Sequence, residues 1–515
     1  MICRDTQDAA TKNYDLVVIG GGVYGAMLTL SAAQRGLRVL LLERDDFGAA
    51  TSHNSLRIIH GGLRYLQTAD LKRFRDSVSD RHWFLRNFPQ LVRPLSCVMP
   101  LYNQGIRRVP VLRLALSIND LLSRGRNQDI PPASHLPSAR IVDATELRRV
   151  LPTVDTSGLK AGAIWYDAWM PDSQRVLMET LHWACELGAT ALNYVEALRP
   201  AMRGGKLVGV EARDHVANRE HLFRANVAVN ATGPWSAVLA RGFGVRSGVV
   251  LHQSIAWNVV LDRPPVSDHA AAVTPRQRGG QTYFLLPWKG KILAGTGHAP
   301  WGDSPERPMP SAEQLDVFIE RLNSAVPDLR LSRRSILRVF AGLLPAADAM
   351  SAQLAVREAV YDHSVDAGIV GLWTVCGVKF TNARSVAKRL LNRIFPNSPP
   401  YADTQRSIAP RANAPANAAP VSGYDYEWLP LGDDGWRTAL RGVVADEAVQ
   451  HLDDLVLRRT SLGDNARRAL KLSGSLCELF DWTEDRRASE VARLRAAYAW
   501  NGGESLASEV GPGGS

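Results

Sequence analysis

The chain has 515 residues, of which 45% are hydrophobic and 22% charged. This hydrophobic fraction is enough to form a large core, so the composition excludes a disordered or fibrous protein. Its five cysteines form no CxxC pair, so we expect neither a disulfide framework nor a structural metal site. The net charge of +10 favours anionic partners, and the lack of zinc-finger spacing and RNA-binding motifs argues against nucleic acid.

The first segment predicts a βαβ unit. Tyr14–Ile19 (YDLVVI) is an apolar run typical of a buried parallel strand, Ala26–Arg35 reads as a helix, and Arg38–Leu42 (RVLLL) predicts a second strand. The residues before it lack the apolar core of a secretion signal, and no stretch reaches the roughly 18 apolar residues of a membrane-spanning helix. We therefore expect a cytoplasmic protein.

Three glycines stand between this strand and helix in the pattern GxGxxG: Gly20, Gly22 and Gly25. In a dinucleotide-binding fold the first permits a sharp turn, the second lets the backbone approach a pyrophosphate, and the third lets helix and strand pack closely. Glu43, about 20 residues on, is placed to accept hydrogen bonds from ribose hydroxyls. The unit predicts a dinucleotide site without distinguishing FAD from NAD, while an ordinary strand–turn–helix with flexible glycines is the alternative.

Between Leu66 and Pro152 the chain is rich in arginine and has helical spacing, and strand-like segments follow. These segments are Ala161–Asp167, Lys206–Asp214, Asn226–Gly233, Gln281–Trp288, Lys291–Gly297 and Ser335–Leu343. Residues 396–425 are rich in Pro and Ala and predict a linker.

The end of the chain predicts a helical C-terminal domain over residues 426–500. Asp446–Arg459 and Asp464–Leu479 carry apolar residues at three- and four-residue spacing, as amphipathic helices do. Residues 501–515 are rich in Gly and Ser and predict a disordered tail.

Five motifs follow one another along the chain. They are ATSHNSLRIIHGGLRYL (Ala50–Leu66), VNATGPW (Val229–Trp235), LLPWKGKILAGTG (Leu285–Gly297), TVCGVKFTNAR (Thr374–Arg384) and AVQHLDDLVLRRTSLG (Ala448–Gly463). Together they resemble the FAD-dependent glycerol-3-phosphate dehydrogenase family. The resemblance implies an α/β fold whose Rossmann-like FAD-binding domain (residues 14–65, 153–240 and 345–395) carries an inserted antiparallel-sheet substrate domain (residues 66–152 and 241–344).

The resemblance also implies an activity in glycerol metabolism. The expected reaction is oxidation of a small phosphorylated polyol, first of all glycerol 3-phosphate to dihydroxyacetone phosphate, with electrons passing to quinone or another acceptor at the inner membrane face. Gly105–Ile118, with Arg124 and Arg126 beyond it, combines apolar residues with arginines as an interfacial membrane helix does, although packing within the protein explains the pattern equally well. The sequence leaves the oligomeric state open.

The resemblance implies three groups of FAD contacts beyond the glycine turn. They lie at the pyrophosphate and isoalloxazine, near the ADP half, and at the flavin edge whose N1/O2 atoms gain negative charge on reduction. In that order they are Thr51, Ser52, Gly61 and Gly62; Ala231, Thr232 and Gly233; and Gly377, Val378 and Lys379.

Arginine suits a phosphate substrate because its planar fork grips phosphate with two hydrogen bonds. The positions that match the family's substrate residues are Arg64, Tyr65 and Arg357, with Lys379, although each arginine taken alone reads as a solvated surface residue. Where the family has arginine before proline, this chain has Leu344.

Arg338 shares strand parity with position 344, but six residues at about 3.3 Å each place it about 20 Å away, so it cannot substitute. His60 and, second, His298 are the candidate bases for the substrate hydroxyl, and a hydrogen-bonded structural histidine is the alternative for each. The altered pocket leaves two other functions open: a related flavoprotein oxidase acting on an amine, an amino acid or a non-phosphorylated alcohol, and a flavin-binding protein without catalysis.

Overall fold

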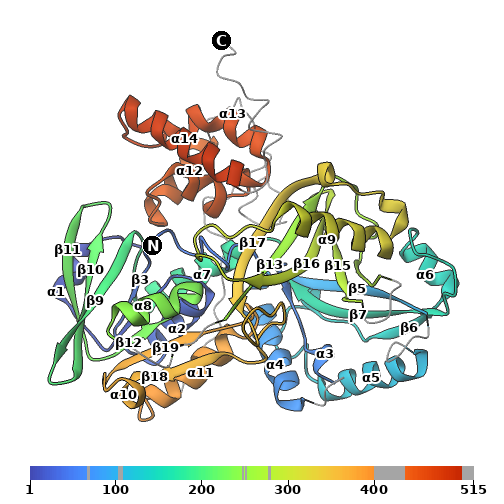
Figure 1. Ribbon diagram of the computed structural model, residues 1–515, viewed down its shortest axis with the longest axis horizontal. Coiled ribbons are helices and arrows are strands. Elements are labelled where there is room, and N and C mark those ends of the chain that lie inside the picture. The colour runs from blue at the N-terminus through green and yellow to red at the C-terminus, as the bar shows by residue number, and fades with distance from the viewer. Residues whose placement is uncertain are drawn as a thin grey trace.

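The computed structural model describes residues 1–66, 70–102, 108–245, 249, 252–275, 280–398 and 435–500. The described residues form three β-sheets, helices that pack on them and a group of C-terminal helices (Figure 1). A six-stranded sheet lies between a four-stranded sheet at one end and a nine-stranded sheet at the other, and the C-terminal helices stand above them in the view of Figure 1. This architecture confirms the predicted α/β fold class.

The six-stranded sheet has the order β18-β19-β12-β2-β3-β8, with β18 antiparallel to β19 and the other neighbours parallel. Its strands are β2 (Leu16–Ile19), β3 (Val39–Leu42), β8 (Thr190–Leu192), β12 (Ala228–Asn230), β18 (Ala359–Asp362) and β19 (Leu372–Cys376). Helices cover one face: α2 (Val23–Ala33), α7 (Ser173–Glu186) and α11 (Ala383–Ile394). All residues of β2 and β3 are buried, as in parallel sheets covered on both faces.

The four-stranded sheet covers the other face and shares a core with it. Its order is β1 (Asn13–Tyr14), β11 (Arg219–Ala225), β10 (Lys206–Asp214) and β9 (Val195–Arg203). Val17 and Leu40 of the six-stranded sheet pack with Val210 and Phe223. Alternate residues of β2 therefore point into the cores on opposite faces of the six-stranded sheet. A shift of one residue would exchange the two sets, so this alternation fixes the register of β2 with its neighbours.

The nine-stranded sheet has the order β17-β13-β16-β15-β14-β5-β7-β4, with β6 on β7. Its strands are β4 (Ile58–Ile59), β5 (Arg93–Leu101), β6 (Arg140–Asp143), β7 (Ala161–Trp169), β13 (Gln253–Leu261), β14 (Ala270–Val273), β15 (Tyr283–Trp288), β16 (Lys291–Trp301) and β17 (Ile336–Pro345). The pairs are antiparallel except β14 with β5. The expected boundaries assign β4 and β7 to the FAD-binding part, whereas both strands pair within this sheet because their apolar residues share its core.

Helices flank this sheet on both faces. α9 (Ala312–Ala325) contributes to the hydrophobic core on one face of the sheet, and α5 (Val109–Leu122) contributes to the core on the other face. The other helices outside the C-terminal group are α1 (Thr6–Thr11), α3 (Leu63–Leu66), α4 (Leu71–Asn87), α6 (Ala144–Val150), α8 (Ser236–Gly242) and α10 (His363–Asp366). α4 and α5 fall where helical spacing was seen in the sequence.

The C-terminal helices are α12 (Gly435–Asp446), a π-helical turn (Asp454–Arg459), α13 (Ala466–Cys477) and α14 (Glu484–Trp500). The predicted helix over Asp464–Leu479 matches α13. The predicted helix over Asp446–Arg459 is wrong in its first half, because Asp454 accepts the backbone N–H groups of Gln450 and His451 and so starts the helical turn later. The expected tail and nearly all of the expected linker lie outside the described residues.

Candidate functional site

The glycine turn between β2 and α2 has the geometry expected of a dinucleotide site. Gly20 has φ +108°, and a Cβ there would lie 2.7 Å from the carbonyl oxygen of Ala231. A Cβ on Gly25 would overlap the carbonyl oxygen of Gly20, so helix and strand approach as closely as the sequence predicted. Gly22 opens α2 and has no side chain to cap it, so the positive end of the helix dipole lies at this turn.

Glu43 lies against this turn from the end of β3. Its Oε2 accepts a hydrogen bond from the backbone N–H of Gly21 at 2.6 Å, and its Oε1 accepts one from Asp45 at 2.8 Å. Burial, together with the negative charge of Asp45, raises the pKa of Glu43 to about 7. The carboxylate is thus beside the turn where the sequence placed it, within reach of a ribose bound there.

The loop after β3 closes the turn from a second side. Ser52 Oγ accepts the backbone N–H of Val23 at 2.9 Å, in the first turn of α2. Thr51 Oγ1 donates to the carbonyl of Leu343 at 3.1 Å and accepts the N–H of the same residue at 3.2 Å. The loop therefore ties the glycine turn to the end of β17 in the nine-stranded sheet.

The end of β12 meets the same turn. Ala231 N–H donates to the carbonyl of Ile19 at 2.8 Å, and Thr232 Oγ1 donates to Asn230 at 2.7 Å. Gly233 has φ +57°, and its carbonyl accepts a weak hydrogen bond from the thiol of Cys376 at 3.5 Å. These residues and the glycine turn lie together, as expected for one nucleotide-binding edge.

His60 follows β4 and is anchored by Asp167 of β7. The distance between His60 Nδ1 and Asp167 Oδ2 is 3.1 Å. A Cβ on Gly61 would overlap the guanidinium of buried Arg81, while Gly62 has φ +87°. These two glycines are thus required by packing and by backbone geometry as well as by any approach to a flavin.

His298, the second candidate base, lies on β16 in a different environment. Burial and, second, the positive charge of Arg64 lower the pKa of His298 to about 4. Its Nδ1 is buried without a hydrogen-bond partner among the described residues. A neutral imidazole with so low a pKa is a weak proton acceptor, so the structure favours His60 over His298 as a base.

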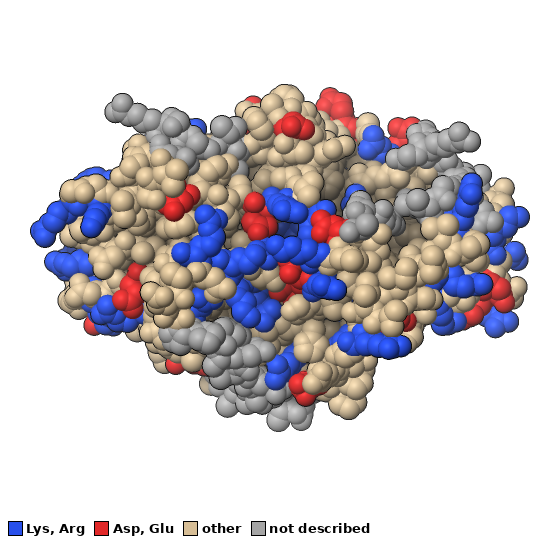
Figure 2. Space-filling model, turned by 90° about the horizontal axis from the view of Figure 1, so that it is seen from below, with Lys and Arg blue, Asp and Glu red and all other residues tan. Residues whose placement is uncertain are grey.

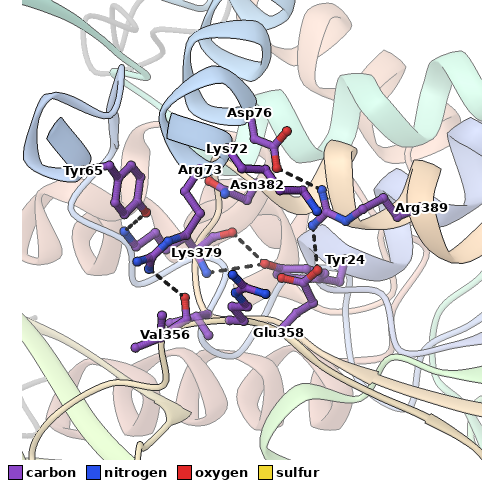
Figure 3. Close-up of a pocket in the computed structure, with 12 residues that line it drawn as sticks. Tyr24, Tyr65, Lys72, Arg73, Asp76, Val356, Glu358, Lys379, Asn382 and Arg389 are labelled. Carbon is purple, nitrogen blue, oxygen red and sulfur yellow. Dashed lines mark hydrogen bonds and ion pairs between the residues drawn. The ribbon is translucent and has the colours of Figure 1, made fainter. Parts of the chain in front are cut away.

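A small pocket of about 80 Å³ lies at the end of β19 and the start of α11 (Figure 3). The side chains around it come from α2, the α3–α4 region, the segment after β17, the turn between β19 and α11, and α11 itself. They are Tyr24, Tyr65, Lys72, Arg73, Asp76, Val356, Arg357, Glu358, Val378, Lys379, Asn382 and Arg389. This volume is far below the roughly 300–1,000 Å³ of drug-sized sites, so the pocket suits a small molecule.

Lys379 is at the centre of this pocket. Its ammonium group donates to the hydroxyl of Tyr65 and lies 4.7 Å from the centre of the same ring. Tyr24 OH donates to the backbone carbonyl of Lys379 at 2.9 Å, and the Tyr24 ring fills the space where a Cβ on Gly377 would lie. The structure thus brings Tyr65, Val378 and Lys379 together, as the resemblance implied.

The pocket is positively charged. Five basic side chains line it against two carboxylates, and both carboxylates pair with Arg389, at 3.2 Å for Asp76 and 2.6 Å for Glu358. Arg73 lies 4.7 Å from the Tyr65 ring centre and donates to the carbonyl of Val356. On the face that Figure 2 shows, which is the molecule of Figure 1 seen from below, Lys and Arg gather across the middle with a few Asp and Glu among them, so this face attracts anions.

Arg357 lines the pocket, whereas His60, Arg64 and His298 are not among its lining residues. Leu344 is half-buried on β17 and pairs with Ser254 of β13. Arg338 reaches away from the pocket, to the carbonyl of Gly463 in the C-terminal region at 3.2 Å. It therefore does not replace an arginine at position 344, as the sequence predicted.

Sequence reasoning missed several residues of this region. Asp167 ends a predicted strand, so its proximity to His60 could have been found had the pairing of that strand been known. Tyr24 stands inside the glycine pattern, but its contact with Lys379 joins residues 355 positions apart. Arg73 and Arg389 lie in no recognised motif, and no sequence pattern indicates that they line the pocket.

Comparison with known proteins gives a consistent result. The family model described as FAD dependent oxidoreductase matches residues 15–392. Glycerol-3-phosphate dehydrogenase from Synechocystis sp. is 30% identical over 87% of this chain and 80% of its own. Aerobic glycerol-3-phosphate dehydrogenase from Bacillus subtilis is 28% identical over 76% of this chain and 68% of its own. The structure of glycerol-3-phosphate dehydrogenase from Bacillus halodurans, complexed with FAD, shares the fold with a TM-score of 0.74 and 21% identity over 96% of each chain.

Proposed function

Because the chain belongs to the FAD-dependent oxidoreductases and, within them, to the glycerol-3-phosphate dehydrogenase family, we propose that it oxidises glycerol 3-phosphate to dihydroxyacetone phosphate. The observation that carries the choice of substrate is the small pocket beside Lys379, with five basic side chains and two carboxylates. A phosphate monoester is a small dianion, and such a pocket binds it in preference to neutral alcohols.

FAD is the cofactor of this family, and the residues of the glycine turn fit it. Cβ atoms at Gly20 and Gly25 would meet the carbonyl oxygens of Ala231 and Gly20, and the first turn of α2 would offer a pyrophosphate the N–H groups that Ser52 does not already bind. Glu43, Ser52 and Ala231 border the same turn. When bound, FAD supplies the acceptor for a hydride and passes the electrons on.

Substrate binding, contact with the cofactor and proton transfer fall to different residues of the chain. Lys379, Tyr65 and Arg357 bind and orient the phosphorylated substrate, and Arg64 is next to Tyr65 in sequence. Gly377 and Val378 bring the end of β19 and the start of α11 to the cofactor, where oriented N–H groups favour a gain of negative charge. His60 takes the hydroxyl proton because Asp167 orients its ring.

Anaerobic mixing tests this function. Glycerol 3-phosphate is expected to bleach the yellow flavin absorbance, whereas glycerol without its phosphate is expected to do so at least about 100-fold more slowly at equal concentration. Equal rates with the two compounds would contradict the assignment of the pocket to phosphate.

Leu344 favours one alternative, a flavoprotein oxidase whose substrate presents an apolar group or a carbon–nitrogen bond at this position. The same apparatus distinguishes it: bleaching by amines or amino acids, and none by glycerol 3-phosphate, would support the alternative. A flavin that dithionite bleaches but no candidate donor does would support a non-catalytic flavin-binding protein.

We also propose that the protein docks on the inner face of an anionic membrane through α5, where quinone is a suitable electron acceptor. Within the described residues no helix is long and apolar enough to cross a bilayer. α5 exposes an apolar stripe, and exposed arginines flank it. The stripe is Val111, Leu114, Ile118 and Leu121, and the arginines are Arg108, Arg113 and Arg124.

Vesicle sedimentation tests this docking. The protein is expected to sediment with vesicles containing phosphatidylglycerol and to remain in solution with phosphatidylcholine alone. Leu114→Asp, at a side chain that is 63% exposed, is expected to abolish sedimentation. Val317→Asp on α9, where Val317 is 44% exposed, is the matched control, and an equal loss in both variants would contradict the assignment to α5.

A further inference from the structure

The pairing of β4 with β7 places His60 next to Asp167. Ile58 lies opposite Trp169 and Ile59 opposite Ala168, so the next step of this antiparallel register brings His60 to Asp167. The His60 ring also packs against Phe284, with 5.6 Å between ring centroids. His60 is therefore held by a strand register and a ring contact, although it follows the end of its own short strand.

Asp167 is fixed from three sides. Its side chain is only 6% exposed, and its Oδ1 accepts hydrogen bonds from the backbone N–H of Gly61 at 2.7 Å and from Arg81 at 3.0 Å. Arg81 is itself buried and also donates to the carbonyl of Tyr166 at 2.8 Å. These contacts leave Oδ2 directed at His60, and the absence of a side chain on Gly61 gives Arg81 the space to approach.

The carboxyl group of Asp167 is ionised at neutral pH. Burial alone would raise the pKa of Asp167, but the hydrogen bond with His60, the charge of Arg81 and the hydrogen bond from the Gly61 N–H hold this pKa below its usual value. An ionised carboxylate only accepts hydrogen bonds. A neutral His60 must therefore carry its proton on Nδ1, which leaves the Nε2 lone pair unprotonated.

We propose that Asp167 is a positioning residue that holds His60 in this tautomer, with Nε2 as the proton acceptor for the substrate hydroxyl. The inference rests on the proposed alcohol oxidation. In that step the hydroxyl O–H bond breaks and its proton passes to His60 Nε2, the C–H bond breaks and its electron pair passes with the hydrogen to FAD, and a carbonyl forms. The resulting imidazolium faces the Asp167 carboxylate, which stabilises its charge.

Asp167→Asn tests the tautomer. The amide oxygen still accepts from Gly61 and Arg81, but the amide nitrogen now faces His60 and donates to Nδ1, which places the ring proton on Nε2. The rate of flavin bleaching by glycerol 3-phosphate is expected to fall about 10²–10⁴-fold, with the FAD content and the oxidised spectrum unchanged. Asp214→Asn is the matched control, since Asp214 is a buried carboxylate paired with Arg4 in the four-stranded sheet, and its rate is expected to stay within about twofold of the parent.

A double-mutant cycle separates positioning from a structural role. If Asp167 acts through His60, Asp167→Asn causes no further loss of rate in the His60→Ala background. An equal loss in both backgrounds would overturn the proposal and assign Asp167 to packing.

Imidazole ¹⁵N NMR of the unaltered holoenzyme gives a second measurement that does not depend on the variants folding well. The Nδ1–H tautomer of His60 is expected, and an Nε2–H tautomer would overturn the proposal. Failure of glycerol 3-phosphate to bleach the unaltered protein is a different outcome, because it overturns the proposed function and leaves the tautomer result to be judged on its own.

Discussion

The two ends of the proposed site are built from very different stretches of chain. The nucleotide end is almost contained in one βαβ unit, in which Gly20, Gly25 and Glu43 lie within 24 consecutive residues. The pocket end gathers Tyr65, Arg357 and Lys379 from three distant segments, and no two of them are neighbours in sequence. Close backbone packing therefore determines the geometry of the nucleotide end, whereas charge and contacts between distant segments determine the geometry of the pocket end.

The largest effect is expected at the nucleotide end. A Cβ in Gly25→Ala would overlap the carbonyl oxygen of Gly20, so strand and helix must separate and the pyrophosphate site is lost. FAD affinity is expected to fall at least about 100-fold, measured by fluorescence titration of the protein without cofactor. Gly242→Ala on α8, where a Cβ meets nothing within 4 Å, is the control and should bind FAD normally.

The pocket end should give the opposite pattern, with FAD retained and chemistry lost. Lys379→Met removes the ammonium group beside Tyr65, and the bimolecular rate of flavin bleaching by glycerol 3-phosphate is expected to fall about 10³-fold. Lys471→Met on α13 is the control for loss of one exposed lysine. A Lys379→Met protein that loses FAD but keeps its rate when FAD is added would show that the two ends are not separable in this way.

A smaller gain is expected from restoring the arginine that the resemblance implies at position 344, although Leu344 is not among the lining residues of the pocket. Leu344→Arg places a guanidinium at the end of β17, and turnover of glycerol 3-phosphate is expected to rise about five- to tenfold. Steady-state kinetics with an artificial acceptor measure this change. An unchanged or lower rate would count against a substrate role for position 344.

The smallest effects are pH dependences of opposite sign. Because the pKa of Glu43 is raised to about 7, Glu43 lowers the free energy of unfolding as pH rises from about 4.5 to 7 in the protein without FAD. Because the pKa of His298 is lowered to about 4, His298 lowers the same free energy as pH falls from 6.5 to about 4.

Urea unfolding between pH 5 and 6.5 separates the two groups. Glu43→Gln is expected to make the free energy of unfolding rise more steeply with pH, and His298→Gln to make it rise less, each by about 1 kcal/mol across the window. Slopes that change in the same direction would contradict the assigned environments.

The nucleotide end could be predicted from the sequence because its residues belong to one βαβ unit and are positioned by segments close to them in sequence. Gly20, Gly25 and Glu43 are set by the order of one strand, one turn and one helix, and the structure gives the two glycines the close approaches expected of them and places Glu43 against the turn. That Arg338 cannot replace an arginine at position 344 could also be judged from strand geometry alone, since residues on one strand keep a fixed spacing.

The pocket end could be read only in part, because its contacts depend on how distant elements pack. The resemblance named Tyr65, Arg357 and Lys379, but no local rule places Arg73 or Arg389 beside them. The partner of His60 depended on the register of β4 with β7, and β7 was itself expected in another domain. Charged residues that meet across elements leave no periodic trace in a single sequence.

The most direct test of the whole account is an anaerobic titration of the purified holoprotein with glycerol 3-phosphate, with the product identified. The account predicts that the flavin absorbance bleaches in proportion to the glycerol 3-phosphate consumed and that an equal amount of dihydroxyacetone phosphate appears. A flavin that dithionite bleaches while excess glycerol 3-phosphate leaves it yellow would contradict the proposed function.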